Sequence, residues 1–162
     1  MVDGLGYACA LLLAGLFVWA GAAKLARPKA TAAGFTALGV PAGATVARAV
    51  SFVELAVAAT LLATPRAGAG VALVLLTAFT AFLARAVLSG IRAPCNCFGT
   101  GRADPVSWAD VVRNVMLIAV AVVGLGAPDP AVPRPAAVAA AVGAFASGYL
   151  IVRTLRERRP AG

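Results

Sequence analysis

The stretch LGYACALLLAGLFVWAGAAKL, residues Leu5 to Leu25, contains Lys24 as its one charged residue. An apolar run of about 20 residues is long enough to cross the hydrocarbon core of a membrane as a helix. Four further apolar runs follow, at about 46–63, 69–88, 108–125 and 136–152. The sequence therefore predicts an all-α fold, a polytopic transmembrane helix bundle of about five spans, with residues 1–162 forming a single integral membrane domain.

The overall composition supports a membrane protein. Of the 162 residues, 62% are hydrophobic and 12% are charged, whereas a soluble domain carries about a quarter charged residues. The net charge is +8, but the basic residues lie between and beside the apolar runs. They do not form the basic face with interleaved aromatic residues that a nucleic-acid-binding protein needs. We interpret them as topology determinants and contacts to lipid headgroups.

Charge distribution predicts an orientation in the membrane. Basic residues are concentrated in the first and third connections and in the tail after Val152. Positive residues favour the cytoplasm, so this count predicts an outside N-terminus and a cytoplasmic third connection. A thiol switch that serves exported proteins would instead be expected at the outer face, so the orientation stays open. The start Met1–Gly4 lacks the positive region of a cleaved signal peptide, so the first run is expected to be retained.

Two connections carry local structural signals. The interval Ala26–Thr45 is broken by glycines and prolines, and Phe35, Leu38 and Val40 are suited to a short interfacial helix within it. The segment Thr64–Gly68 predicts a tight turn between the second and third spans.

The third connection contains PCNCFG, residues Pro94 to Gly99, with cysteines at 95 and 97. A bridge between Cys95 and Cys97 closes a small ring and departs from relaxed disulfide geometry, so it is reduced more readily than a structural bridge. Asn96 tolerates the turn between the two sulfurs, and Gly99 can adopt a positive φ. This pattern favours a thiol–disulfide switch at the mouth of the bundle.

Two other interpretations of the cysteine pair stay open. The pair can be static and shape the loop, or it can be half of a metal site. A closed zinc site needs about four Cys or His ligands, and the chain has no histidine and one further cysteine. Metal binding is therefore the weakest of the three interpretations, and the sequence predicts neither a metal nor a cofactor.

Several polar residues lie inside the spans, in the half of the bilayer next to the cysteine pair. They are Lys24, Glu54, Arg85, Arg113 and Asn114. The functional hypothesis is that Glu54 pairs with Arg85 or Arg113, while a nearby cation stabilises a thiolate of the pair. The alternative is that the arginines extend to lipid headgroups and Glu54 only holds helices together. In either case, an acid at that depth is expected to face the interior.

Small residues in the first span are expected to serve packing. Cys9 lies on the face opposite the cysteine pair, so we interpret it as a small packing residue. Gly15 and Gly21 indicate close approach of helices.

The cysteine segment Cys95–Gly99 is followed by Trp108 and then by Arg113-Asn114 at the start of an apolar run. This order resembles the C-x-C-F-G … W … R-N pattern of the MauE family of methylamine-utilisation membrane proteins, which are related to DoxX-like bundles. Two upstream matches are Ala23–Leu25 with Pro28, and Glu54–Ala56. The resemblance covers about Gly15 to Leu125, and Asn96 departs from the glycine that is common between the family's cysteines.

The resemblance implies a multi-pass protein of the bacterial inner membrane with a DoxX-like four-helix core and a C-terminal helix. It implies a role in maturing an exported, disulfide-rich enzyme subunit beside a thioredoxin-like partner of the MauD type. Cys95 and Cys97 would be the redox pair, with Glu54, Lys24, Arg113 and Asn114 as polar surroundings.

Two classes of function follow. In the first, the protein is a membrane thiol–disulfide oxidoreductase that exchanges electrons with its partner through a mixed disulfide. In the second, it is a non-catalytic membrane scaffold or assembly factor with a structural Cys-x-Cys loop. A transporter is less well supported, because the spans lack a pair of broken helices in matching halves.

Overall fold

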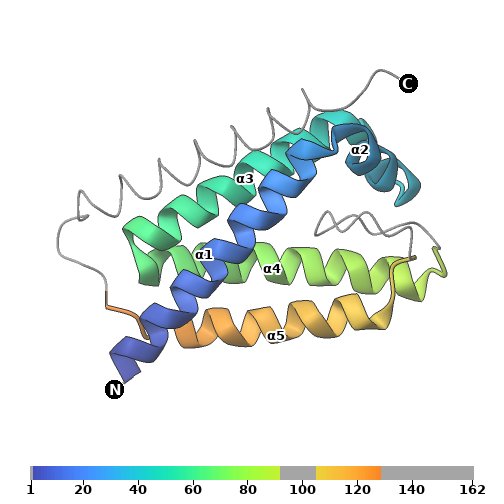
Figure 1. Cartoon of the computed structure of the whole chain (residues 1–162). Helices are drawn as coiled ribbons and strands as arrows, with labels where there is room; N and C mark the ends of the chain where they lie inside the picture. The colour runs from blue at the N-terminus through green and yellow to red at the C-terminus, as the bar shows by residue number, and fades with distance from the viewer. Residues whose placement is uncertain (1, 92–104, 129–162) are drawn as a thin grey trace.

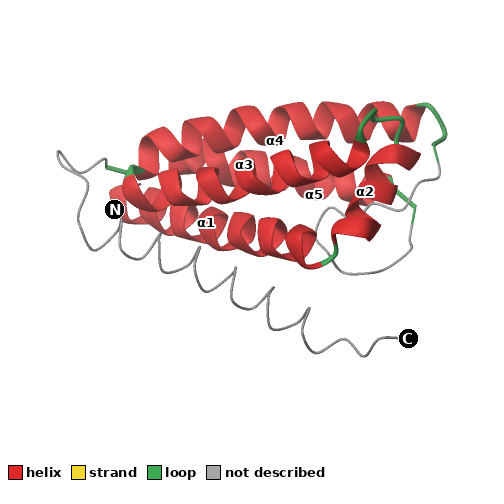
Figure 2. Ribbon diagram, turned by 90° about the horizontal axis from the view of Figure 1, so that it is seen from above, coloured by secondary structure: helices red, strands yellow, loops and turns green. Residues whose placement is uncertain are grey.

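The computed structural model describes residues 2–91 and 105–128, and every element in these two ranges is a helix. The helices are α1 (Val2–Ala26), α2 (Pro28–Ala37), α3 (Gly43–Ala63), α4 (Pro65–Leu88) and α5 (Trp108–Gly124) (Figures 1 and 2). The predicted all-α class is confirmed. The predicted span at 136–152 lies outside the described residues.

Prolines determine where two of the helices begin. Pro28 and Pro65 occupy the first position of α2 and α4, where the missing N–H of proline leaves no hydrogen bond unmade. Arg27 and Thr64, which precede them, have φ angles of −126° and −136°, because a proline ring disfavours helical backbone in the residue before it. The predicted turn over 64–68 is therefore wrong. Thr64 alone joins α3 to α4.

Four helices form a closed ring. α1 packs against α3 and α5, and α4 packs against the same two helices, so that α1 and α4 lie diagonally opposite. The long axes of these helices run roughly side by side, with α1 crossing the others at an angle (Figure 1). Side chains from all four helices therefore point toward one interior.

The centre of the ring is packed with small and aliphatic side chains. Leu13 and Leu61 are the largest fully buried apolar residues of this cluster. The alanines of the cluster are Ala10, Ala14, Ala58, Ala69, Ala72 and Ala121. Alanine lets helix backbones approach closely, which is how helices associate in lipid, where there is no water to drive apolar burial.

The outer surface of the ring is apolar. Large apolar side chains such as Trp19, Phe52, Val74 and Met116 are more than half exposed. α1 from Gly4, α3 and α4 are long and apolar enough to cross a membrane, whereas α5 has 17 residues. An apolar exterior around helices of this length matches a lipid environment.

α2 is the short helix of the first connection. It begins earlier than expected, at Pro28, and packs mainly against α3 with Phe35 buried. Leu38, just after α2, packs against Leu83 and its neighbours near the end of α4 and the start of α5. The chain just after α2 therefore contacts the end of the bundle where α4 ends and α5 begins.

Candidate functional site

Lys24 and Glu54 form an ion pair in the interior of the bundle. Lys24 Nζ donates a hydrogen bond to Glu54 Oε1 over 2.6 Å. Lys24 is 3% exposed and Glu54 is 8% exposed. A charge removed from water costs several kcal/mol unless it is paired, so each residue needs the other. The prediction that Glu54 faces the interior is confirmed.

The geometry of α1 and α3 brings the two charges together. Lys24 lies in the last turn of α1, and Glu54 lies near the middle of α3. The two helices run in opposite directions (Figure 1). Helical side chains lean toward the N-terminus of their own helix, so these two lean toward each other. Thr31 Oγ1, in α2, lies 3.0 Å from the Arg27 carbonyl and 3.4 Å from the Lys24 carbonyl, so its hydroxyl links α2 to the end of α1.

The prediction that Glu54 pairs with Arg85 or Arg113 is wrong. Arg113 lies on the outside of α5, with 44% of its side chain exposed, and its Nη2 donates to Asp110 Oδ1 at 3.1 Å. Arg85 is exposed in the last turn of α4. Successive residues of a helix are turned by about 100°, so Asn114 faces inward while Arg113 faces outward. Lys24 fills the position that we expected an arginine to take.

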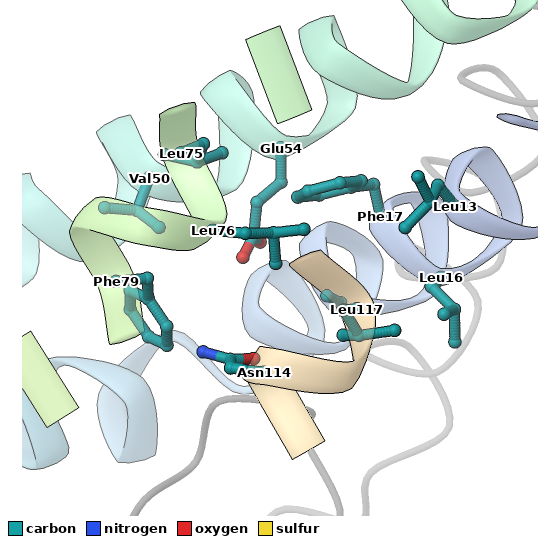
Figure 3. A pocket seen from close by; sticks show the side chains of 11 residues that line it. Leu13, Leu16, Phe17, Val50, Glu54, Leu75, Leu76, Phe79, Asn114 and Leu117 are labelled. Atoms are coloured by element: carbon teal, nitrogen blue, oxygen red, sulfur yellow. The ribbon is translucent and has the colours of Figure 1, made fainter. Parts of the chain in front are cut away.

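A pocket lies beside the ion pair, inside the ring. Its cavity volume is about 40 Å³, room for a small polar group, and it is partly open to the surface. Side chains from α1, α3, α4 and α5 line it (Figure 3). The apolar lining residues are Leu13, Leu16, Phe17, Ala20, Val50, Leu75, Leu76, Phe79 and Leu117. The two polar lining residues of the described chain are Glu54 and Asn114, so the pocket wall is apolar except at these two side chains.

Each of these two polar side chains has one atom without a hydrogen bond. Glu54 Oε2 and Asn114 Nδ2 are buried, and neither has a partner within the described part of the chain. Asn114 is 2% exposed, and in Figure 3 its amide nitrogen is directed toward the Phe79 side of the pocket. Buried polar groups are nearly always hydrogen-bonded in folded proteins. These two atoms therefore mark a place where a further group can bind.

The structure describes one of the three cysteines of the chain, Cys9. Cys95 and Cys97 lie outside the described residues. Cys9 is half-buried and free, and its neighbour Ala10 has its backbone nitrogen 4.0 Å from the Cβ position of Gly124. Cys9 thus lies near the end of α5, away from the α4–α5 connection. Within residues 2–91 and 105–128, no group of three or more potential metal ligands is present.

Asp110 is a structural residue that we did not predict. The Ser107 backbone N–H donates to Asp110 Oδ2 at 3.0 Å, and the Ser107 hydroxyl donates to the same oxygen at 3.2 Å. Serine followed three residues later by an acid, before an apolar run, is a readable sign of a helix start. The pocket residues Phe17 and Phe79 carry no such sign, because an aromatic residue in an apolar run is ordinary.

A ring of apolar helices with an apolar exterior and a paired charge inside defines an integral membrane protein. The chain belongs to the MauE family: the family model described as "Methylamine utilisation protein MauE" matches residues 2–127. The predicted family is confirmed, and the match includes all five described helices.

A similar curated protein is the methylamine utilization protein MauE of Paracoccus denitrificans. It is 40% identical over 134 residues, which cover 77% of this chain and 72% of that protein. The comparison with solved structures gave no match.

Proposed function

We propose that this protein is a multi-pass protein of the bacterial inner membrane that carries out thiol–disulfide exchange with a thioredoxin-like partner of the MauD type. Its role is the maturation of an exported protein in methylamine utilisation. Membership of the MauE family supports the pathway. The observation that carries the chemistry is the Cys-x-Cys pair, Cys95 and Cys97, in the connection between α4 and α5.

The exchange conserves atoms and electrons. A thiolate of the reduced partner attacks the Cys95–Cys97 disulfide, forms a mixed disulfide and releases one of the two cysteines as a thiolate. The partner's second thiol then attacks the mixed disulfide. The products are an oxidised partner and two reduced cysteines, with two electrons and two protons transferred. The reverse sequence reduces the partner by the same steps.

The described residues supply a rigid support for this connection. α4 ends at Leu88 and α5 begins at Trp108, and Leu83, Val106 and Val111 pack together beside them. Arg85 and Arg113 lie near these helix ends and are exposed, so they are the cations that we propose lower a thiol pKa in the pair. Lys24 and Glu54 hold α1 and α3 together through their ion pair.

The first experiment follows the two thiols directly. Full-length protein in lipid nanodiscs is equilibrated with graded glutathione buffers and alkylated, and peptide masses are measured. We expect the peptide that carries Cys95 and Cys97 to change from a bridged to a doubly alkylated form, and a Cys9→Ser variant to behave identically. A pair that stays in one state in every buffer would contradict the exchange function.

The second experiment separates exchange from the scaffold function. Cys95→Ser leaves Cys97 able to form a mixed disulfide that cannot be resolved within the chain, so it is expected to trap a MauD-type partner. No mixed disulfide, together with normal maturation activity of both single cysteine variants, would favour a scaffold with a structural loop. Labelling with a membrane-impermeant thiol reagent determines which compartment the pair faces.

A further inference from the structure

The pocket inside the ring has a composition that points to a ligand. Two buried side chains, Glu54 and Asn114, each carry an unpartnered polar atom at it; the Glu54 side chain is 10% exposed and Asn114 is 2% exposed. They come from different helices, α3 and α5, whereas the other described residues that line the pocket are apolar. Leaving a buried polar group without a hydrogen bond is unfavourable, so a molecule that bonds to both atoms would bind with a gain in free energy.

The two atoms specify the chemistry of that molecule. Asn114 Nδ2 is a donor and needs an acceptor, whereas Glu54 Oε2 is a carboxylate oxygen and needs a donor. A hydroxyl group is both, because its oxygen accepts and its hydrogen donates. The apolar walls require that the rest of the molecule be hydrophobic.

We propose that this pocket binds a lipid-soluble molecule through a hydroxyl group, with Asn114 donating to the hydroxyl oxygen and Glu54 accepting from the hydroxyl hydrogen. The pocket is partly open and belongs to helices that are apolar on the outside, so such a molecule can enter from the bilayer. The hydroxyl enters the pocket and the apolar remainder of the molecule extends from its open side. Two sources supply this chemistry: an alkyl-quinol and a lipid alcohol such as a diacylglycerol.

The binding proposal and the thiol chemistry use different residues, since none of the described residues that line the pocket is a cysteine. A Cys95→Ser, Cys97→Ser double variant is therefore expected to bind as the wild type does. If that variant binds normally while the thiol experiments fail, the pocket proposal stands and the exchange proposal does not.

The test is a titration of the full-length protein in nanodiscs of saturated phosphatidylcholine, a lipid without a hydroxyl group. The probes are a decyl-hydroquinone kept under argon, dioctanoylglycerol, and the O-methylated form of each as matched control. Bound probe is counted by native mass spectrometry. We expect one probe per chain, and at least about tenfold weaker binding of the O-methylated form, because one charge-assisted hydrogen bond is lost.

The two probes distinguish the sources. Saturable binding of the hydroquinone alone assigns a quinol, and saturable binding of dioctanoylglycerol alone assigns a lipid alcohol. If neither binds, or if the O-methylated probes bind equally well, the two polar atoms are satisfied by water and the proposal is wrong.

Variants localise the binding. Asn114→Leu removes the donor and is expected to weaken binding about tenfold, whereas Met116→Leu, an exposed position of the same helix, is expected to leave it unchanged. Equal affinity of Asn114→Leu and wild type would overturn the assignment. If Asn114→Leu does not fold, Ala20→Leu is the second variant, because a larger side chain on α1 fills the pocket. Binding that is retained in Ala20→Leu would also overturn the assignment.

Discussion

Gly21 of α1 lies directly against the backbone carbonyl of Ser51 in α3. A Cβ atom at residue 21 would come 3.0 Å from that oxygen and 2.9 Å from Leu55 Cγ. Gly21 precedes Lys24 by one helical turn, and Ser51 precedes Glu54 by one helical turn. The close contact between the two backbones therefore sets the separation at which the ion pair forms.

We expect Gly21→Ala to destabilise the bundle by about 1–3 kcal/mol, because α1 and α3 must move apart to admit the methyl group. Unfolding in mixed micelles with increasing SDS, followed by circular dichroism, measures the change. Gly15→Ala is the matched control, since nothing lies within 4 Å of its Cβ position. That variant should be neutral or slightly stabilising, because alanine favours a helix over glycine. Equal effects of the two variants would contradict the contact.

Replacing one member of the ion pair is expected to destabilise the bundle strongly. Lys24→Met or Glu54→Leu alone leaves a buried charge without its partner, which costs about 3–5 kcal/mol. The double variant should recover most of this loss, because two apolar side chains of similar volume need no partner. The same SDS titration measures all three variants. Arg113→Gln, which breaks the exposed pair with Asp110, should change stability by no more than about 1 kcal/mol. Additive losses in the double variant would contradict the coupling.

Gly68 of α4 lies directly against the backbone of α3. A Cβ atom there would lie 2.5 Å from both the backbone N and the Cα of Leu61. Because backbone atoms cannot rotate away, Gly68→Ala should cost about 3 kcal/mol or more and lower the amount of folded protein in membranes. A Cβ atom at residue 70 would have Leu125 Cδ2 as its one neighbour within 4 Å, at 3.8 Å. The Gly70→Ala variant should therefore accumulate as the wild type does. The amount of protein extracted in folded form measures both, and normal accumulation of Gly68→Ala would disprove the close approach.

Asp110 holds the first turn of α5 through Ser107. Asp110→Ala should destabilise that turn by about 1 kcal/mol, because the Ser107 N–H and hydroxyl lose their acceptor. Hydrogen exchange of the first amides of α5 is the measurement. Asp110→Asn keeps an acceptor oxygen and should exchange at a rate between the alanine variant and the wild type. Identical exchange in all three proteins would show that the cap contributes nothing.

Much of the fold can be predicted because it depends on composition and length. Apolar runs near 20 residues predicted the helices, and the ends of α3, α4 and α5 agree with the expected spans to within a residue. The starts of α3 and α4 were placed too late, because we took Gly43, Pro65 and Gly68 as breakers. A proline at the first helical position begins a helix. The total number of spans and the fifth span stay predictions.

The site was only partly predictable because pairing depends on the angular phase of helices. Lys24 and Glu54 were both selected from the sequence, and Glu54 was correctly placed in the interior. Its partner was not, since depth along a helix says nothing about which face a neighbouring arginine occupies. Gly15 and Gly21 look alike in the sequence, yet only Gly21 makes a close contact. Their difference arises from the crossing of α1 over α3.

The charges of Lys24 and Glu54 also bear on how the chain enters the membrane. If either helix entered the membrane alone, it would carry an unpaired charge into the hydrocarbon. If α1 and α3 enter together, the two charges form a neutral pair. We therefore expect α1 to remain at the insertion machinery until Glu54 has emerged from the ribosome. The first three helices would then move into lipid in one cooperative event.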